Sequence, residues 1–341
     1  MILLNQRKGS FSRAPRRWPA NGCVLAGIFS LLLSMVADTA RAQSIAPSPD
    51  VVQQLNTAVG QRVEATAVFG TQNIASRAGL GWTLNDADGS IYKIPWDFEL
   101  WEPGPLGETG MNWTMVLNGG VGYGRFVNKF QKNVLAGNES DFNSLALGVG
   151  VGPRLYFGDT GFSVLTAFGL VYAYTKNDFH AHNALGDSIV ADGRYVNWTA
   201  QTISVEPSIG LQYKKAFGRW TPKVNSDFAY FNTQPIYRST DALSFTSHSM
   251  IWANKFDLDY LTPWNVWDCP MHFGGDIGRT DLFQGLRGAL GTDHFYQTDG
   301  RLTFDVLGRI WKVKSVGISG GYFWCETFSG YSIGLEGSVS F

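Results

Sequence analysis

The chain ends on the sequence YSIGLEGSVSF, residues 331–341. Over this stretch, aromatic and aliphatic side chains take every second position, and serine, glutamate and glycine occupy most of the positions between them. One face holds Tyr331, Ile333, Leu335, Gly337, Val339 and Phe341, and the other holds Ser332, Gly334, Glu336, Ser338 and Ser340. Because successive side chains of a β-strand point to opposite faces, the pattern predicts a strand with one apolar and one polar face.

The position of this strand at the chain terminus adds a second signal. A final Phe341 with an aromatic residue ten positions earlier resembles the C-terminal signal that outer-membrane barrels present to their assembly machinery. The alternative is an ordinary amphipathic strand that happens to end the chain. The resemblance implies the assembly machinery and the outer-membrane lipids as partners.

The same alternation recurs upstream and predicts an all-β fold, a 12-stranded antiparallel transmembrane β-barrel with a short N-terminal helix. The even number of strands places both chain ends on the periplasmic side. Stretches 157–160 and 309–314 then become short periplasmic turns, and stretches 127–141, 175–200, 232–245 and 282–296 become external loops. The twelve strands are expected near 62–83, 91–101, 112–126, 142–157, 162–174, 201–213, 221–231, 246–261, 271–281, 297–309, 314–325 and 330–341.

Composition agrees with a membrane barrel. Aromatic residues make up 14% of the chain and charged residues 16%, below the roughly 25% of soluble domains. Tryptophans at predicted strand ends fit aromatic belts at the membrane interfaces. These are Trp96, Trp101, Trp220, Trp264, Trp267, Trp311 and Trp324.

The N-terminus has the three parts of a secretory signal peptide. Five basic residues lie within the first seventeen, an apolar run follows over 23–36, and Ala40-Arg41-Ala42 supplies a cleavage site. We therefore expect residues 1–42 to be a cleaved signal peptide and Gln43 to be the first residue of the mature protein. The mature chain holds 21 Lys and Arg against 27 Asp and Glu. This acidic balance argues against nucleic acid as a partner.

A short helix precedes the predicted strands. Ser48-Pro49-Asp50 provides a cap, a proline at the first helical position and an acid in the first turn. Val51, Val52, Leu55 and Val59 recur at helical spacing, and Gly60 is expected to end the helix. The predicted organisation is thus a signal peptide over 1–42, a segment 43–60 with a helix, and a barrel over 61–341.

One short helix followed by twelve strands resembles the translocator barrel of autotransporters, over residues 48–341. The resemblance implies a helix inside the barrel lumen and no passenger domain, since only Gln43 to Pro47 precede the helix. Small residues at inward positions of two neighbouring strands favour the same placement, because glycine often marks the close approach of another backbone. Alternatively, they only permit wall curvature. They are Gly120, Gly122, Gly124, Ala146, Gly148, Gly150 and Gly152.

Three groups of residues are of types that could form a chemical site. His248 and Ser249 are adjacent, so on a strand their side chains fall on opposite faces and form no catalytic pair. Asp293-His294 resembles half of a barrel protease site. Asp178, His180 and His182 share one side of an extended loop and could approach a metal ion, but such pairs are more often solvated. We predict no catalytic residue, no metal site and no cofactor, with His272 one lumen residue among many.

Charged side chains at predicted inward positions carry both signs. They are Lys93, Asp97, Glu99, Arg154, Glu206, Lys223, Asp227, Lys255, Asp257, Asp259, Asp276, Arg301, Asp305, Arg309 and Glu336. Salt bridges between neighbouring strands could fill a narrow barrel, or a charged ring could set the selectivity of a pore. The function predicted first is a non-enzymatic, plugged or nearly plugged barrel of the bacterial outer membrane. The alternatives are a small channel for polar solutes and a surface barrel enzyme acting on lipid or peptide.

The register also separates the two cysteines of the mature chain. Cys269 is expected in a periplasmic turn and Cys325 at the external end of its strand. An apolar band about 25 Å tall would lie between them, whereas a disulfide requires Cα atoms within roughly 7 Å.

Deleting Phe341 should reduce the amount of folded protein in the outer membrane and leave protease-sensitive chain in the periplasm. The reason is that the terminal strand carries the assembly signal. Heat-modifiable migration on a gel measures the folded fraction, and an unchanged fraction in the Phe341 deletion would contradict the prediction.

Overall fold

The computed structural model describes residues 49–71, 79–84, 87–129, 137–184, 187, 190, 196–306 and 313–339. The predicted signal peptide, Trp311, Arg309 and Phe341 lie outside these residues. Within them, no helix is both long enough and apolar enough to cross a membrane.

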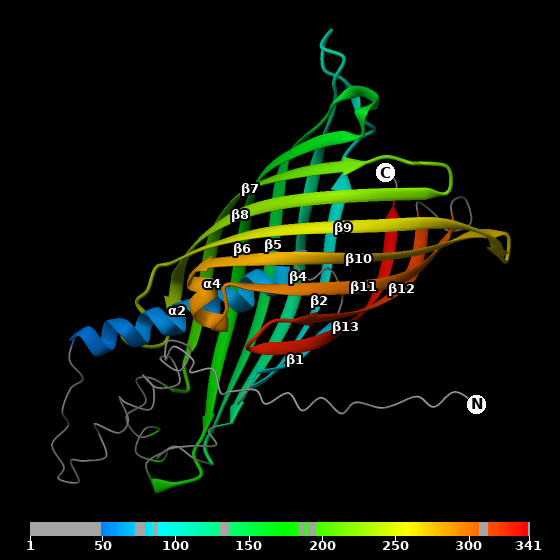
Figure 1. The fold of residues 1–341 in the computed structure, drawn as a ribbon. Coiled ribbons are helices and arrows are strands. Elements are labelled where there is room, and N and C mark those ends of the chain that lie inside the picture. Colours follow the sequence, from blue (N-terminus) through cyan, green and yellow to red (C-terminus); the bar gives the residue numbers. More distant parts are fainter. Residues whose placement is uncertain are drawn as a thin grey trace, which may run out of the picture.

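The described strands form a single antiparallel sheet that closes on itself (Figure 1). Twelve of them form the ring. The ring closes at β1, which pairs with β13 on one side and with β2 on the other. The two-residue strand β3 (Gly104–Pro105) pairs only with β4. The twelve are β1 (Gly79–Leu84), β2 (Ala87–Glu99), β4 (Asn112–Lys129), β5 (Glu139–Tyr156), β6 (Phe162–His180), β7 (Thr199–Lys214), β8 (Trp220–Arg238), β9 (Ser247–Val266), β10 (Cys269–Gln284), β11 (His294–Asp305), β12 (Val313–Trp324) and β13 (Phe328–Val339).

The sequence prediction of a twelve-stranded antiparallel barrel is confirmed, and eleven predicted strands overlap β2 and β4 to β13. The predicted strand 62–83 is wrong over residues 62–71, and its residues 72–78 lie outside those that the structure describes. Helix α2 spans Pro49–Thr71, so it does not end at Gly60, and β1 covers only the last part of the predicted strand.

The misreading of residues 61–71 has a physical cause. Polar Arg62, Glu64 and Thr66 alternate with apolar neighbours, which imitates the period of a strand. From Val63 to Thr71 every residue of the helix is buried, so no polar stripe at helical spacing marks this part as a helix. The barrel segment therefore does not begin at residue 61 as predicted.

The barrel has two unlike ends. One end, called the turn end, carries the short connections 157–161, 215–219 and 267–268 and the longer segment 100–111, which contains β3. The opposite end, called the loop end, carries the connections 130–138, 181–198 and 285–293. The connection 285–293 contains helix α4 (Gly285–Leu290).

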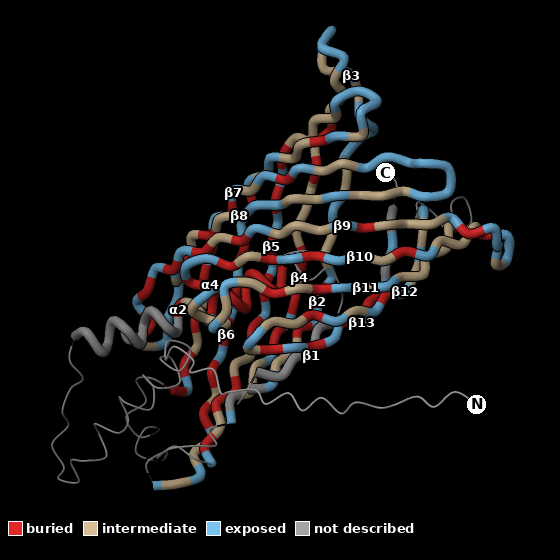
Figure 2. The backbone as a smooth tube through the Cα atoms, viewed as in Figure 1, coloured by how far each residue is buried: buried red, intermediate tan, exposed pale blue. Residues whose placement is uncertain are grey.

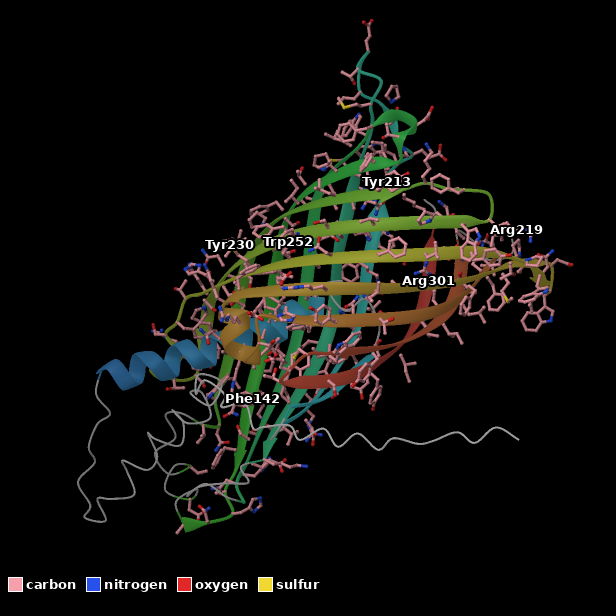
Figure 3. The ribbon with its side chains drawn as sticks, viewed as in Figure 1. Phe142, Tyr213, Arg219, Tyr230, Trp252 and Arg301 are labelled. Carbon is pink, nitrogen blue, oxygen red and sulfur yellow. The ribbon has the colours of Figure 1, made fainter. Side chains whose placement is uncertain are left out.

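Burial alternates along the strands as the sequence predicts (Figure 2). On β13, Tyr331, Ile333 and Leu335 are exposed on the outer wall, whereas Ser332 and Gly334 are buried. Tyr213, Tyr230 and Trp252 are among the side chains drawn in Figure 3. Aromatic residues gather near both ends, with Trp220–Tyr260 and Phe162–Tyr213 near the turn end and Tyr296–Trp324 near the loop end. The predicted placement of tryptophans at strand ends is thus confirmed for those that are described.

Helix α2 enters the barrel from the loop end, and its N-terminal turns lie beyond the strand ends (Figure 1). Its C-terminal part lies against β4 and β5 in the lumen. A Cβ atom built on Gly122 would lie 2.2 Å from the Gly70 carbonyl oxygen, and one built on Gly148 would lie 2.9 Å from the Thr71 Cβ. Five of the seven predicted small residues meet the helix, over its segment 66–71 rather than 48–60, whereas Gly150 and Gly152 meet only residues of the wall.

Gly122→Ala should lower the free energy of unfolding by about 1–3 kcal/mol, because the added methyl group would displace the backbone of α2. Gly300→Ala is the matched control, since a Cβ there meets nothing within 4 Å. Urea unfolding in detergent measures both variants. Equal stability of the two would show that α2 is not held against this part of the wall.

Candidate functional site

Apolar side chains fill the space between α2 and the wall at the loop end. Val68 and Phe69 of the helix join one buried cluster with wall residues. Val63 joins a second cluster, which includes Trp198 and Phe245. Ala67 packs in a third, where the partners are Ala146, Val171 and Ala173. The wall residues of the first cluster are Ile91, Phe231, Ile251, Leu282, Phe295, Phe323 and Phe328.

One carboxylate lies in the middle of this apolar region. Glu64 is 0% exposed and accepts hydrogen bonds from three hydroxyl groups of β8 and β9. Thr233 Oγ1 donates to Oε1 at 2.9 Å, Ser247 Oγ donates to Oε2 at 2.6 Å, and Ser249 Oγ donates to the same oxygen. We call these three hydroxyl groups the carboxylate seat. Because a buried carboxylate is costly without partners, the seat fixes which face of α2 meets β8 and β9.

Burial and hydrogen bonding shift the pKa of Glu64 in opposite directions. Burial raises the pKa of the Glu64 carboxyl group, and the hydroxyl donors of the seat act against that rise. Because α2 lies inside the lumen, the wall separates the Glu64 carboxyl group from lipid, and burial shields it from bulk water.

Helix α4 packs on α2 at the mouth of the barrel. Leu286 is fully buried in the same cluster as Val68 and Phe69. Its backbone N–H donates to Ser249 Oγ at 3.0 Å. The chain enters α4 through Gln284, whose φ of 54° is a conformation that non-glycine residues rarely adopt. Such a conformation costs on the order of 1–3 kcal/mol and persists only where surrounding contacts hold it.

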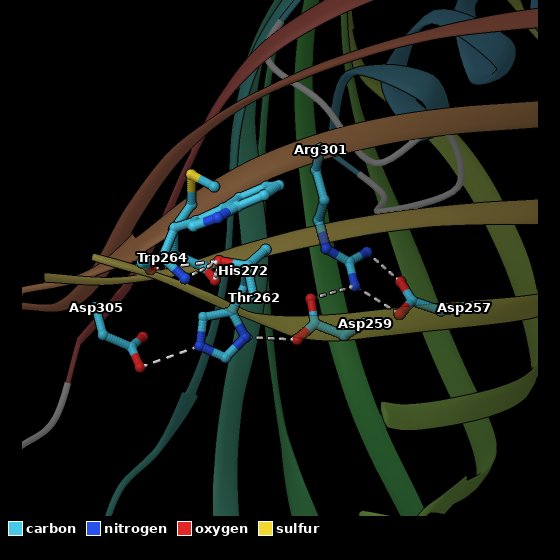
Figure 4. A network of polar contacts seen from close by, with 8 residues as sticks. Asp257, Asp259, Thr262, Trp264, His272, Arg301 and Asp305 are labelled. Atoms are coloured by element: carbon cyan, nitrogen blue, oxygen red, sulfur yellow. Dashed lines mark hydrogen bonds and ion pairs between the residues drawn. The ribbon is translucent and has the colours of Figure 1, made fainter. Parts of the chain in front are cut away.

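The turn-end half of the lumen is polar (Figure 4). Arg301 donates to both Asp257 and Asp259, at 2.6 Å from its Nη2 to Asp257 Oδ1 and 3.3 Å to Asp259 Oδ1. His272 lies between Asp259 at 2.8 Å and Asp305 at 3.2 Å. We call these five residues the lumen ion cluster. Since both ring nitrogens of His272 face carboxylates, the arrangement suits an imidazolium that donates twice.

Further ion pairs line the lumen. Lys255 of β9 meets Asp276 of the neighbouring strand β10 at 2.9 Å, which confirms the predicted pairing between neighbouring strands for this pair. Arg154 of β5 instead reaches past β4 to Asp97 at 3.2 Å and Glu99 at 2.9 Å, both on β2. Arg309 and the side chain of Glu336 lie outside what the structure describes.

The histidines that could form part of a catalytic or metal site lie apart from one another. His248 is exposed and contacts the Tyr230 hydroxyl at 2.9 Å, while Ser249 points inward, so the predicted separation of the two is confirmed. His294 contacts the neighbouring Asp293 at 2.6 Å. Asp178 pairs with Lys176 at 2.8 Å, and no group of three or more metal-ligating side chains is assembled among the described residues.

Cys269 begins β10 at the turn end, and Cys325 follows β12 at the loop end. Both are free thiols. The register that placed them at opposite ends of the barrel is therefore confirmed.

A closed barrel with an apolar outer wall, aromatic residues near both ends and a helix in its lumen defines a transmembrane protein of the bacterial outer membrane. The chain belongs to the family of solitary outer-membrane autotransporter β-barrel domains, which it matches over residues 85–333. No curated protein sequence matches it.

Three solved structures are similar to the chain. The transport unit of the autotransporter AIDA-I from Escherichia coli has 9% identity and a TM-score of 0.51, covering 84% of this chain and 99% of that one. The translocator domain of NalP from Neisseria meningitidis has 11% identity and a TM-score of 0.47, covering 91% and 99%. The β domain of BrkA from Bordetella has 11% identity and a TM-score of 0.43, covering 75% and 94%. The AIDA-I structure supports the fold.

Sequence reasoning missed Glu64, its seat and α4. One signal was present, because Glu64 is a lone acid between apolar Val63 and Ala65. Ser247 and Ser249 also fall on the inward face at the start of a strand, where small hydroxyl groups leave room for a partner.

Glu64→Ala should destabilise the docking of α2 by about 3 kcal/mol, because it leaves the hydroxyl groups of the seat without their acceptor. Glu64→Gln keeps one oxygen and the volume of the side chain, so its effect should be smaller. Limited proteolysis of α2 measures the docking, with Glu108→Ala, an exposed acid between β3 and β4, as the control. Protection of α2 that is equal in Glu64→Ala and Glu108→Ala would contradict the role of the seat.

Proposed function

We propose that the protein is a non-catalytic outer-membrane barrel whose lumen is closed by α2. The observation that carries the proposal is the carboxylate seat, which ties the buried helix to the wall by three hydrogen bonds inside an apolar surround. A helix about 10 Å in diameter leaves little free section in a narrow barrel.

The proposal includes the direction of the chain. An even strand count places the turn end at the periplasm and the loop end at the cell surface. Since α2 enters from the loop end, the segment before Pro49 would emerge at the cell surface. Residues 1–42 would direct export and be removed, so that the exposed segment would begin at Gln43.

The main alternative is a small channel for polar solutes. The lumen ion cluster favours it, because charged walls are typical of aqueous pores. Its weakness is that the cluster's three carboxylates are all bound by Arg301 or His272 and lie in the turn-end half, whereas the loop-end half is filled with apolar side chains. For the barrel enzyme, His248 lies with the Tyr230 hydroxyl on the outer wall, away from the inward Ser249, and His272 lies between two carboxylates.

Planar-bilayer recordings of the purified protein test closure directly. The full mature chain should show little steady current, and a variant lacking residues 43–71 should conduct persistently, because the lumen is then open. A variant lacking only residues 43–48 is the control and should remain closed. Gel migration before and after heating verifies that each variant is folded. Equal currents from the full chain and the folded 43–71 deletion would overturn the proposal.

A further inference from the structure

The connection between β10 and β11 turns inward over the mouth of the barrel. Leu282 N donates to the Asp293 carbonyl at 2.7 Å, which closes the base of the connection. Beyond this point the chain forms α4, whose Leu286 side chain reaches the apolar cluster around α2. Thr327, in the connection between β12 and β13, donates to the Leu290 carbonyl at 3.4 Å. The helix is therefore held by the barrel at both of its ends.

The surface of α4 that faces α2 has no room for a side chain at two positions. A Cβ atom on Gly285 would lie within 2.8 Å of two seat atoms, Ser249 Oγ and Ser247 Oγ, and of Glu64 Oε2. A Cβ atom on Gly288 would lie 2.4 Å from Gln61 Oε1. The two glycines thus let α4 lie directly on the polar side of α2.

Ser249 joins the two helices through a single oxygen atom. Its hydroxyl group donates to Glu64 on α2 and accepts the backbone N–H of Leu286 on α4, at 3.0 Å. Ser247 lies on the same face of β9 and also donates to Glu64, but within the described part of the chain it makes no hydrogen bond to α4. The two serines therefore differ in whether they link α2 to α4.

We propose that α4 is a latch on the loop end that keeps α2 in the lumen, with Ser249 as the joint between them. This rests on the closure of the lumen by α2 proposed above. Release of α4 removes one contact from the seat and uncovers Gln61 and Glu64, so α2 becomes free to shift toward the loop end, from which it entered.

The latch is the part that moves first. A helix of six residues has no stability of its own, so α4 stays folded only through its contacts with α2 and the wall. Arg287 is exposed on its outer side, whereas α2 is enclosed from Val63 to Thr71. Opening therefore begins at the surface side of the barrel, where a change outside the cell can act on α4 without entering the lumen.

Hydrogen exchange in the two serine variants of the full mature chain tests the joint. Ser249→Ala should speed amide exchange about tenfold or more over both 285–290 and 61–71, in line with the loss of hydrogen bonds to a charged partner and to a backbone donor. Ser247→Ala should speed exchange over 61–71 alone. Equal effects of the two variants on 285–290 would overturn the latch, as would unchanged protection of α4 in Ser249→Ala.

A reversible crosslink tests the order of events. Gln61→Cys and Gly288→Cys are combined with Cys269→Ser and Cys325→Ser, so that an oxidised bond joins only α2 and α4. With Ser249→Ala also present, brief channel openings should occur in reductant and disappear on oxidation. Openings that persist in the crosslinked protein would overturn the latch.

The deletion of residues 43–71 separates the two proposals in the same bilayer. If this folded variant conducts no more than the full chain, closure by α2 fails and the latch fails with it. If it conducts persistently while the Ser249→Ala openings do not depend on the crosslink, closure stands and the latch alone is wrong.

Discussion

Every backbone N–H and C=O group in hydrocarbon needs a partner, since each unpaired group costs several kcal/mol. This constraint explains why the six residues of β1 matter out of proportion to their number. They pair on one side with β13 and on the other with β2, and so remove the two free edges of the sheet. Once the wall is closed, its inner face is separated from lipid, and the interior can hold charges and a helix that hydrocarbon would exclude.

The interior satisfies its polar groups in two different ways. Near the turn end, opposite charges on wall strands neutralise one another, as Arg301 of β11 does by reaching past β10 to Asp257 and Asp259 of β9. Near the loop end, one carboxylate from a helix is matched by neutral hydroxyl groups of the wall, and apolar side chains surround it. The first arrangement belongs to the wall alone and needs nothing in the lumen. The second requires α2, because the seat is complete only when Glu64 is present.

The wall could be predicted from the sequence because the two faces of each strand meet different surroundings. Lipid on one side and lumen on the other impose alternation at every second residue, and the β13 pattern of Tyr331, Ser332 and Ile333 is a direct consequence. The contents of the lumen could not be predicted in the same way. Residues 63–71 are buried on every side of the helix, so their polar and apolar side chains do not alternate at helical spacing. Glu64 and Thr233 of its seat are 169 residues apart in sequence, and α4 is a six-residue helix whose conformation depends on contacts with α2.

The pairing of β1 with β13 joins Gly79 to Ile333, so the seam of the barrel connects nearly the two ends of the wall. All other neighbouring strands in the ring follow one another along the chain and can pair as hairpins. The entropy lost in closing so long a loop falls on this one seam, which makes it the slow step of assembly. Because α2 directly precedes β1 in the chain, the helix has to be between the walls by the time the seam forms. The order of synthesis and the order of closure are therefore opposite, because α2 is made before every described strand and is enclosed by the last strand pair to form.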